Sequence, residues 1–204
     1  MRLALLILCL AWAAGANAQA RAVTPIYGQL VMFSFPAGFK PVHANDSGSY
    51  YIQESVLDGQ TVEKWTQMIT VTGSKGLAAK QGMTPQRLLE TVAAGFQRAC
   101  PTTFTAVAVG NMKISGQDAS IVFVGCGSVQ SGAARSESAL LVAIKGASDY
   151  YTIQWAERGA LTSRAPQFDA DMWLARLKKL QPIKVCARIP GEAAPYQSCI
   201  NQKE

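Results

Sequence analysis

The stretch "FTAVAVGNMKISG" (residues 104–116) opens a run of four similar segments that decides the fold class. The three that follow are "ASIVFVGCGSV" (119–129), "ESALLVAIKG" (137–146) and "DYYTIQWAE" (149–157). All four are rich in β-branched and aromatic residues, and short connections with Gly, Ser and Asp separate them. This pattern predicts four strands in a meander. Strands joined by short hairpins are antiparallel, so the segments should form one antiparallel sheet.

Three more strands are expected before this run, at residues 29–35 ("QLVMFSF"), 50–57 ("YYIQESVL") and 64–72 ("KWTQMITVT"). The segment "PAGFKPVHANDSGS" (36–49) carries Pro, Gly, Asn and Ser, which predicts a long loop. Alternation in the third strand places two sets on opposite faces: Trp65, Ile69 and Val71 on one, and Thr66, Thr70 and Thr72 on the other. We therefore expect Trp65 to be buried against a helix.

Two helices are expected from capping signals and apolar spacing. Thr84 followed by Pro85 is an N-cap and first-turn signature, and apolar residues then recur at helical spacing until "ACP" (99–101). The apolar positions are Leu88, Leu89, Val92, Ala93 and Phe96. A second helix is expected over residues 168–180, with acidic side chains in its first turn and basic ones in its last, which complements the helix dipole. These are Asp169 and Asp171, and Lys178 and Lys179.

The expected order is β-β-β-α-β-β-β-β-α, which predicts an α+β fold with two main helices packed on an antiparallel sheet of about six to seven strands. This order, the stretch "QTVEKWT" (60–66), the helix end "ACP" (99–101) and the later cysteines carry a resemblance. The chain resembles the PsbP-like class, which includes photosystem PsbP, the Mog-type Ran-binding proteins and DcrB-type and other bacterial envelope proteins. It also resembles a group of exported proteobacterial proteins. The resemblance implies an accessory or binding role more often than catalysis, and it transfers no functional residue.

The first eighteen residues, "MRLALLILCLAWAAGANA", have the pattern of a cleaved secretory signal peptide. An early arginine precedes an apolar run over residues 3–14, and Cys9 lies inside this run, not at a lipidation position. The alternative is an uncleaved anchor, but the run is shorter than the roughly 20 residues that span a bilayer. We expect cleavage before Gln19, a periplasmic or secreted chain with no transmembrane segment, and a single domain over residues 19–204.

Removing residues 1–18 from the 204-residue chain leaves 186 residues, four of the five cysteines, and a net charge of +5 where the full chain has +6. An even number of cysteines in an oxidising compartment favours two disulfides, for which three connectivities are possible. We expect Cys100 to pair with Cys126, and Cys186 with Cys199. The second bridge would tie down a C-terminal tail, residues 183–204, that has little periodicity.

Motifs for catalysis, metals and nucleotides are incomplete. The stretch "TGSKG" (72–76) lacks the G-x-x-x-x-G-K-[ST] pattern and does not open a helix. The single histidine, His43, has no Cys or His at ligand spacing, and we expect it in a solvated loop. A Ser-His-Asp triad would have to use this residue. The sequence has no CxxC pair, the motif typical of redox chemistry. We therefore expect no catalytic residue, no metal and no cofactor.

Two surface features are candidates for binding. A basic run near the second expected helix, together with a sequence pI of about 9.2, favours an anionic partner, with a solvated helix end as the alternative. Its members are Arg176, Lys178, Lys179, Lys184 and Arg188. The second feature is an aromatic set on expected strands, for which core packing is the alternative. Its members are Tyr50, Tyr51, Tyr150, Tyr151, Trp65 and Trp155.

These features favour an exported, non-catalytic binding or interaction protein. Its expected partner is another envelope protein or an anionic envelope component, and not nucleic acid. The alternative is an envelope hydrolase whose site forms only in three dimensions. A deep cleft that holds His43 within hydrogen-bond reach of a serine and an acidic side chain would favour the hydrolase. A flat surface or an apolar groove would favour the binding protein.

Overall fold

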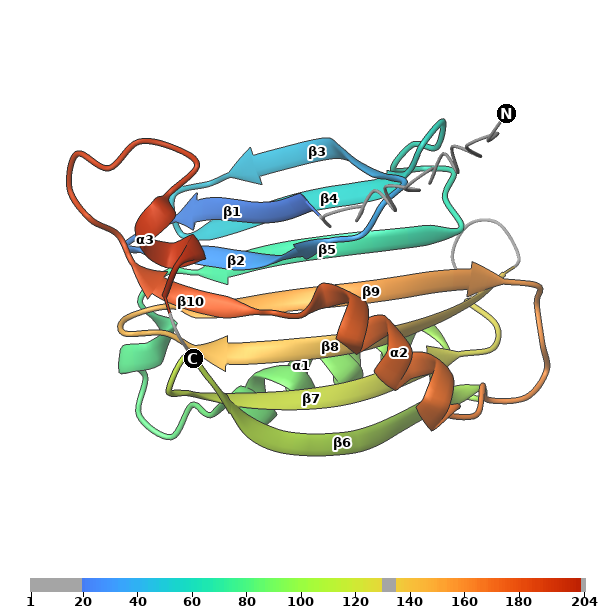
Figure 1. Cartoon of the computed structure of the whole chain (residues 1–204). Helices are drawn as coiled ribbons and strands as arrows, with labels where there is room; N and C mark the ends of the chain where they lie inside the picture. The colour runs from blue at the N-terminus through green and yellow to red at the C-terminus, as the bar shows by residue number, and fades with distance from the viewer. Residues whose placement is uncertain (1–19, 130–134, 203–204) are drawn as a thin grey trace, which may run out of the picture.

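The computed structural model describes residues 20–129 and 135–202, so the expected signal peptide lies outside the described residues (Figure 1). Its strands are β1 (Ala20–Ile26), β2 (Gln29–Phe35), β3 (Phe39–Asp46), β4 (Tyr50–Leu57), β5 (Gln67–Ser74), β6 (Phe104–Ile114), β7 (Gln117–Cys126), β8 (Ser136–Lys145), β9 (Tyr150–Gly159) and β10 (Lys184–Ala187). Its helices are the 3-10 turn η1 (Leu77–Ala79), α1 (Pro85–Ala99), α2 (Ala170–Leu180) and the short α3 (Gln197–Ile200). Within these ranges, no helix has the length and hydropathy needed to cross a membrane.

Seven strands form one antiparallel sheet in the order β3-β4-β5-β9-β8-β7-β6. The expected meander is confirmed, because β6, β7, β8 and β9 pair consecutively. The α+β class with an antiparallel sheet and two main helices is confirmed as well. The chain crosses once within the sheet: β5 pairs with β9 directly, so the strands before α1 join the meander at its last strand.

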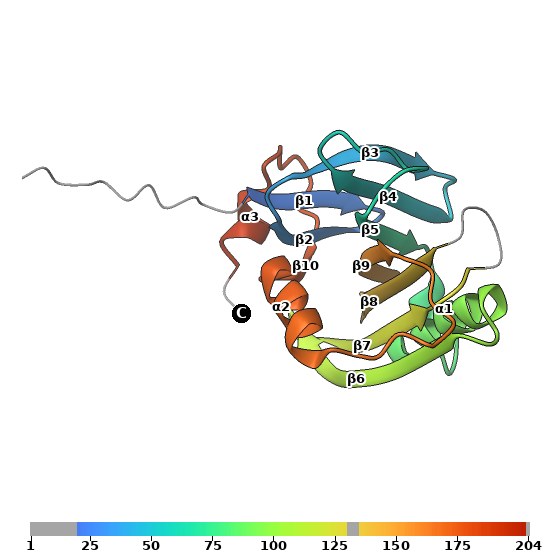
Figure 2. The same ribbon diagram turned by 90° about the vertical axis from the view of Figure 1, so that its right-hand side faces the viewer.

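A second, three-stranded sheet in the order β1-β2-β10 faces one side of the large sheet. Figure 2 shows this small sheet and α2 on one side and α1 on the opposite side. The main core fills the space between the large sheet, the small sheet and α2, with buried residues such as Val31, Ile153 and Trp173. A second core lies between α1 and the other face of the large sheet, where Leu89 and Ala93 of α1 are buried.

The structure has three strands beyond those expected from the sequence. Residues 39–46, expected in a loop, form β3 at the edge of the large sheet, and every residue after Phe39 in it is exposed. Pro41 fits there because an edge strand has a row of backbone groups without ladder partners, and a register shift follows it. The strands β1 and β10 were also unexpected. Both pair with β2, which places an apolar strand at the centre of the small sheet.

The helix α1 begins at its expected cap, and α2 begins two residues later than expected. The hydroxyl of Thr84 accepts a hydrogen bond from the Arg87 amide at 3.2 Å, and Pro85 is the first residue of α1. Asp169 caps α2 by accepting from the Met172 amide at 3.0 Å, so this helix begins at Ala170 instead of residue 168. The expected apolar stripe of α2 is buried: Trp173, Leu177 and Leu180.

Each disulfide of the structure joins a helical segment to a strand. Cys100, the C-terminal cap of α1, is bonded to Cys126 at the end of β7, with their Cα atoms 5.8 Å apart. Cys186 of β10 is bonded to Cys199 of α3, with a Cα separation of 5.6 Å.

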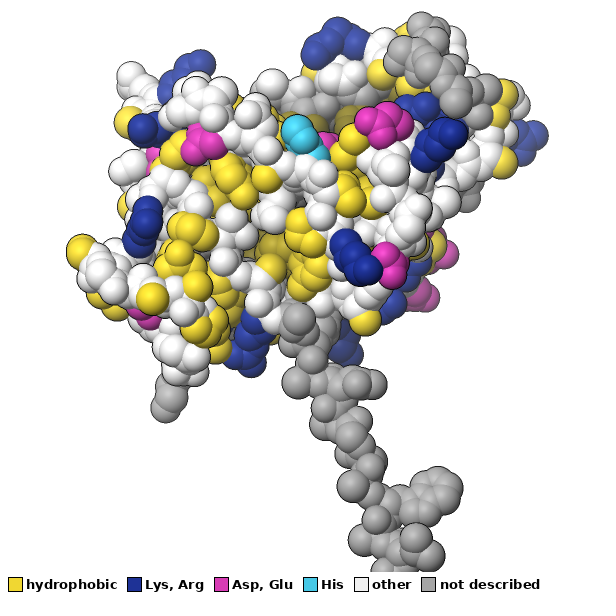
Figure 3. All heavy atoms as spheres, turned by 90° about the horizontal axis from the view of Figure 1, so that it is seen from above, with side chains coloured by type: hydrophobic (Ala, Val, Ile, Leu, Met, Phe, Trp, Pro, Cys, Tyr) yellow, Lys and Arg dark blue, Asp and Glu magenta, His cyan; other side chains and the backbone are white. Residues whose placement is uncertain are grey.

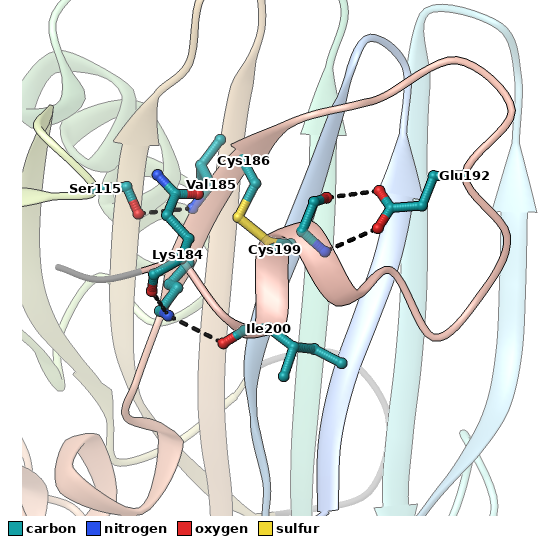
Figure 4. Close-up of a disulfide and its surroundings, with 9 residues drawn as sticks. Ser115, Lys184, Val185, Cys186, Glu192, Cys199 and Ile200 are labelled. Carbon is teal, nitrogen blue, oxygen red and sulfur yellow. Dashed lines mark hydrogen bonds between the residues drawn. A yellow bond between two sulfur atoms is a disulfide. The ribbon is translucent and has the colours of Figure 1, made fainter.

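The C-terminal tail has more structure than expected, as Figure 4 shows. Lys184 donates to the backbone carbonyls of Ile200 and Gln202 at the end of α3. The Glu192 carboxylate accepts from the amide and hydroxyl of Ser198, and these hydrogen bonds lower the pKa of Glu192. With the pairing of β10 to β2, the tail is held by backbone and side-chain bonds as well as by its disulfide.

Candidate binding groove

Alternate residues of β5 point to opposite sides of the large sheet. Ile69 and Val71 are buried in the core toward the small sheet, while Thr70 and Thr72 lie on the side of α1. Trp65 was expected to share a face with Ile69 and Val71, and this is wrong, because β5 begins only at Gln67 and strand alternation does not extend to Trp65. The expected burial of Trp65 against a helix is confirmed: it belongs to the buried cluster that contains Leu89 of α1.

The register of the strands aligns polar side chains in two rows on this side of the sheet. One row consists of Glu54, Thr70 and Gln154, which are direct neighbours across β4, β5 and β9. The adjacent row places Thr72 opposite Thr152, and their hydroxyl oxygens are 2.6 Å apart. Residues directly opposite across antiparallel strands have their Cβ atoms about 5 Å apart, so the first row presents a continuous line of polar groups across three strands, while the second has Ile52 as its member on β4.

The helix α1 covers only part of this face. It packs mainly on β6, β7 and β8, which we call the covered half, and leaves most of this face of β4, β5 and β9, the open half, uncovered (Figures 1 and 2). At the boundary the polar rows meet apolar residues of β8: Gln154 is opposite Leu141, and Thr152 is opposite Ala143. Leu141 and Ala143 are buried in the cluster under α1. The open half and the side of α1 therefore form a groove of about 390 Å³, with Leu88 and Val92 as its helical wall.

One end of the groove is closed by a stacked arginine. The guanidinium carbon of Arg158 lies 3.6 Å from the centre of the Trp65 ring, a cation–π contact. Its Nε donates to the carboxylate of Glu137 at 3.0 Å, and its Nη1 donates to the carbonyl of Glu63 at 3.4 Å. The charge of Arg158 is thus neutralised, and its side chain is fixed as a wall of the groove.

A tyrosine lines the other end of the groove. Tyr50 is 44% exposed, so its ring is available to a ligand. Tyr150, which neighbours the groove, is buried, and its hydroxyl donates to the carbonyl of Met83 at 3.0 Å. Burial, and to a lesser degree the charge of Asp118, raises the pKa of Tyr150, which keeps the phenol protonated as a donor.

Three side chains of the groove floor make no hydrogen bond with any described residue: Glu54, Thr70 and Gln154. Thr70 is only 8% exposed, yet its hydroxyl faces the groove without a protein partner. Polar side chains this far from bulk solvent are normally bonded within the protein. The row therefore offers unused donors and acceptors to whatever fills the groove.

His43 was expected in a loop and lies instead on the edge strand β3, where it is exposed (cyan in Figure 3). Its neighbour across the strands is Glu54. Among residues 20–129 and 135–202, no hydrogen bond connects the imidazole to an acidic side chain or to a serine. The surroundings of His43 thus lack the geometry that the hydrolase alternative needs. In the same ranges, no group of His, Cys, Asp and Glu is placed to hold a metal ion.

The five basic residues expected to bind an anion do not form one site. The Nε of Arg176 donates to Glu157 at 2.6 Å, and its guanidinium lies 5.4 Å from the Trp155 ring centre. Lys184 is 6% exposed because it caps the end of α3. The protein's own groups engage both side chains, and the other three residues of the expected patch lie exposed on the surface: Lys178, Lys179 and Arg188.

Contacts within the protein also show how far the two other candidates from the sequence, the TGSKG stretch and the aromatic set, are available to a ligand. In the "TGSKG" stretch the Gly76 amide donates to the carboxylate of Asp149 at 2.7 Å, so a protein carboxylate occupies the position that an anion would need. Of the aromatic set, Tyr151 and Trp155 are buried in the main core, and Tyr50 is the most exposed member. The polar rows of the groove were not predicted from the sequence. The alternation of Thr70 and Thr72 is visible in the sequence, but the strand register that aligns Glu54 and Gln154 with Thr70 is not.

No protein-family model matches the chain, and no curated protein matches it. Among solved structures, it is similar to cyanobacterial PsbP from Synechocystis sp. PCC 6803, with a TM-score of 0.44 and 12% identity over 83% of this chain and 92% of that one. It is similar to the Saccharomyces cerevisiae Ran-binding protein Mog1p, with a TM-score of 0.44 and 12% identity over 80% and 86% of the two chains. It is also similar to Mycobacterium tuberculosis LpqN, which is involved in cell envelope biogenesis, with a TM-score of 0.38 and 11% identity over 81% and 91%. At these scores the likeness transfers no residue and no ligand to this chain.

Proposed function

We propose that this chain is an exported, non-catalytic binding protein that holds its ligand in the groove between α1 and the open half of the sheet. The observation that carries the proposal is the row of Glu54, Thr70 and Gln154, whose side chains face a preformed groove without protein partners. A small set of placed polar groups in a concave site with apolar walls is the usual design of a ligand pocket. The groove, and not the basic residues near α2, is the proposed binding site.

Export is part of the proposal and rests on the first eighteen residues and on the two disulfides. Disulfides persist in oxidising compartments such as the periplasm or the extracellular space. We expect the exported chain to begin at Gln19. N-terminal sequencing of the protein recovered from the periplasm or medium of an expressing bacterium tests this. A chain that still begins at Met1 would contradict the proposed cleavage.

Capture experiments test the groove as the binding site. The chain from residue 19 is immobilised and exposed to an envelope extract of its source organism, beside the variants Gln154→Ala and Glu54→Ala. Gln97→Ala is the matched control, because Gln97 is exposed on α1 and does not line the groove. We expect the original chain and the control to retain a component that both groove variants lose. Equal retention by all four proteins would overturn the groove as the site.

The captured component also distinguishes binding from catalysis. A binding protein releases its ligand with an unchanged mass, so mass spectrometry of the component before and after incubation should give the same value. Conversion of the component by the original chain and by Gln97→Ala, but not by the two groove variants, would favour the hydrolase alternative. The proposal requires that no conversion depends on the groove residues.

A further inference from the structure

We infer that the ligand of this groove is an uncharged oligosaccharide. The inference rests on the proposed function, since it names the class of ligand for the same site. The argument uses the charge of the lining, the hydrogen-bonding groups of the floor, the pairing of the strands beneath them and the apolar walls.

The charge of the groove argues against an anionic ligand. Its lining carries two carboxylates, Glu54 and Glu137, and one guanidinium, Arg158. The guanidinium is already bonded to Glu137 and stacked on Trp65. No cation of the lining is therefore left to meet a phosphate, a sulfate or a uronate, and the carboxylate of Glu54 would repel one.

The floor offers donors and acceptors in the proportion that a polyol needs. The Glu54 carboxylate accepts, the Gln154 amide donates two hydrogen bonds and accepts, and the Thr70 hydroxyl does both. Sugar hydroxyls likewise donate and accept, so each can bond to one or two of these groups. An uncharged ligand rich in hydroxyls thus satisfies the floor without bringing a charge that would need a partner.

The pairing of the strands argues against an extended peptide. A peptide gains most of its affinity for a sheet by adding a strand to a free edge. The strands β4, β5 and β9 have partners on both sides, so the groove floor offers no free backbone edge. The backbone amides and carbonyls of a peptide lying here could bond only to side chains of the groove, and these are too few to bond all of them.

The walls suit the apolar faces of sugar rings. Leu88 and Val92 of α1 form one side of the groove, and Tyr50 presents a partly exposed ring at one end. An aromatic ring offers an apolar face together with a polar edge, so it can cover a C–H surface while its hydroxyl remains hydrated. The combination of a polar floor and apolar walls fits a ligand that has both kinds of surface.

Nuclear magnetic resonance titrations of the ¹⁵N-labelled chain from residue 19 test the inference. The uncharged probes are maltohexaose, cellohexaose and chitohexaose, and the charged probes are hexagalacturonate and hexalysine. We expect at least one uncharged probe at about 1 mM to shift amides of β4, β5 and β9 in a saturable way. Gln154→Ala and Glu54→Ala should weaken this binding by about tenfold, the effect of losing one hydrogen bond to a partner left unpaired.

Two control variants show whether a loss of binding is specific to the groove residues. Gln97→Ala and Glu90→Ala remove an amide and a carboxylate from exposed positions of α1 that do not line the groove, and both should bind as the original chain does. The amide spectra of all variants show whether each remains folded. A groove variant that unfolds is replaced by Glu54→Gln or Gln154→Glu, which keep the size of the side chain.

The outcomes separate the inference from the proposed function. If a charged probe shifts the same amides, and Gln154→Ala weakens it, the groove is a binding site and the class of ligand is wrong. If an uncharged probe binds but shifts amides elsewhere, the oligosaccharide is overturned as the ligand of the groove. If no uncharged probe shifts β4, β5 or β9, the oligosaccharide is overturned, and the capture experiment alone decides whether the groove binds another ligand.

Discussion

The outer face of the large sheet has two halves that share a backbone and differ in side chains. In the covered half, the residues facing α1 are apolar and many are small, among them Ala139, Leu141 and Ala143. In the open half, the row of Leu141 continues as Gln154, Thr70 and Glu54, and the row of Ala143 continues as two threonines. The row of Ala139 stays apolar, with Ala156, Met68 and Val56. The change occurs between two neighbouring strands, β8 and β9. The position of α1 is therefore set by side chains and not by the shape of the sheet.

Small residues let a helix approach a sheet closely, and apolar ones gain free energy when it does. Neither condition holds in the polar rows of the open half, where a helix would have to bury Glu54 and Gln154 without bonding them. The open half also does not need a helix for stability, because its opposite face is part of the main core. A surface that the fold does not need to cover with a helix can bind a ligand.

The largest effect is expected at the border of the two halves. Trp65 is 8% exposed and packs with α1, so Trp65→Ala should lower the free energy of unfolding by about 3–5 kcal/mol through lost burial and a cavity. The denaturant midpoint measures it. Tyr50→Ala, an aromatic deletion in the open half, is the control and should change stability by only about 0.5 kcal/mol. Equal losses in the two variants would abolish the distinction between the halves.

Much of this architecture can be predicted from the sequence, because its segments carry strong local signals. The meander from β6 to β9 is rich in β-branched and aromatic residues and has short turns, and α1 has Thr84 and Pro85 at its start. The edge strand β3 escapes prediction because its residues are exposed on both faces, so no apolar pattern marks it. The strand β10 has only four residues, and its partner β2 lies more than a hundred residues earlier.

The groove could not be predicted, because it depends on register. Thr70 and Thr72 stand out in one strand, but Gln154 and Glu54 join them only when β9 and β4 pair with β5 in one alignment. Long-range hydrogen bonds also occupy side chains that the sequence suggested as binding residues. Lys184 is an example, since its ammonium group is bonded to carbonyls sixteen and eighteen residues later.

The covered half should depend on the disulfide that ends α1. Replacing Cys100 and Cys126 together by alanine should lower stability by roughly 3 kcal/mol, because the bridge closes a 26-residue separation in the unfolded chain. Thermal or denaturant unfolding measures the loss. Non-reducing peptide mapping checks the pairing itself, and a peptide that links Cys100 to Cys186 would contradict it. A loss below about 1 kcal/mol would mean that α1 holds its position without the bridge.

A smaller effect is expected at the other end of α1. Thr84→Ala removes the acceptor for the Arg87 amide and should cost about 1 kcal/mol. Thr84→Ser keeps the capping oxygen and should retain nearly all of the stability. Urea unfolding of the three proteins gives the comparison. If serine loses as much as alanine, the capping hydrogen bond is not what stabilises this end of the covered half.

The smallest effect is expected in the open half, at the hydroxyl pair of Thr72 and Thr152. Each single substitution by valine leaves the other hydroxyl without its 2.6 Å partner and should cost about 1 kcal/mol. The double variant removes both polar groups and keeps the β-branched shape, so it should unfold within about 0.5 kcal/mol of the original chain. A double-mutant cycle in urea measures this non-additivity, with Thr70→Val as the control because Thr70 has no protein partner to leave unpaired. A loss above about 2 kcal/mol in the double variant would show that the open half supports the fold as the covered half does. A stable double variant that no longer binds the ligand would instead place the threonines among the binding groups of the groove.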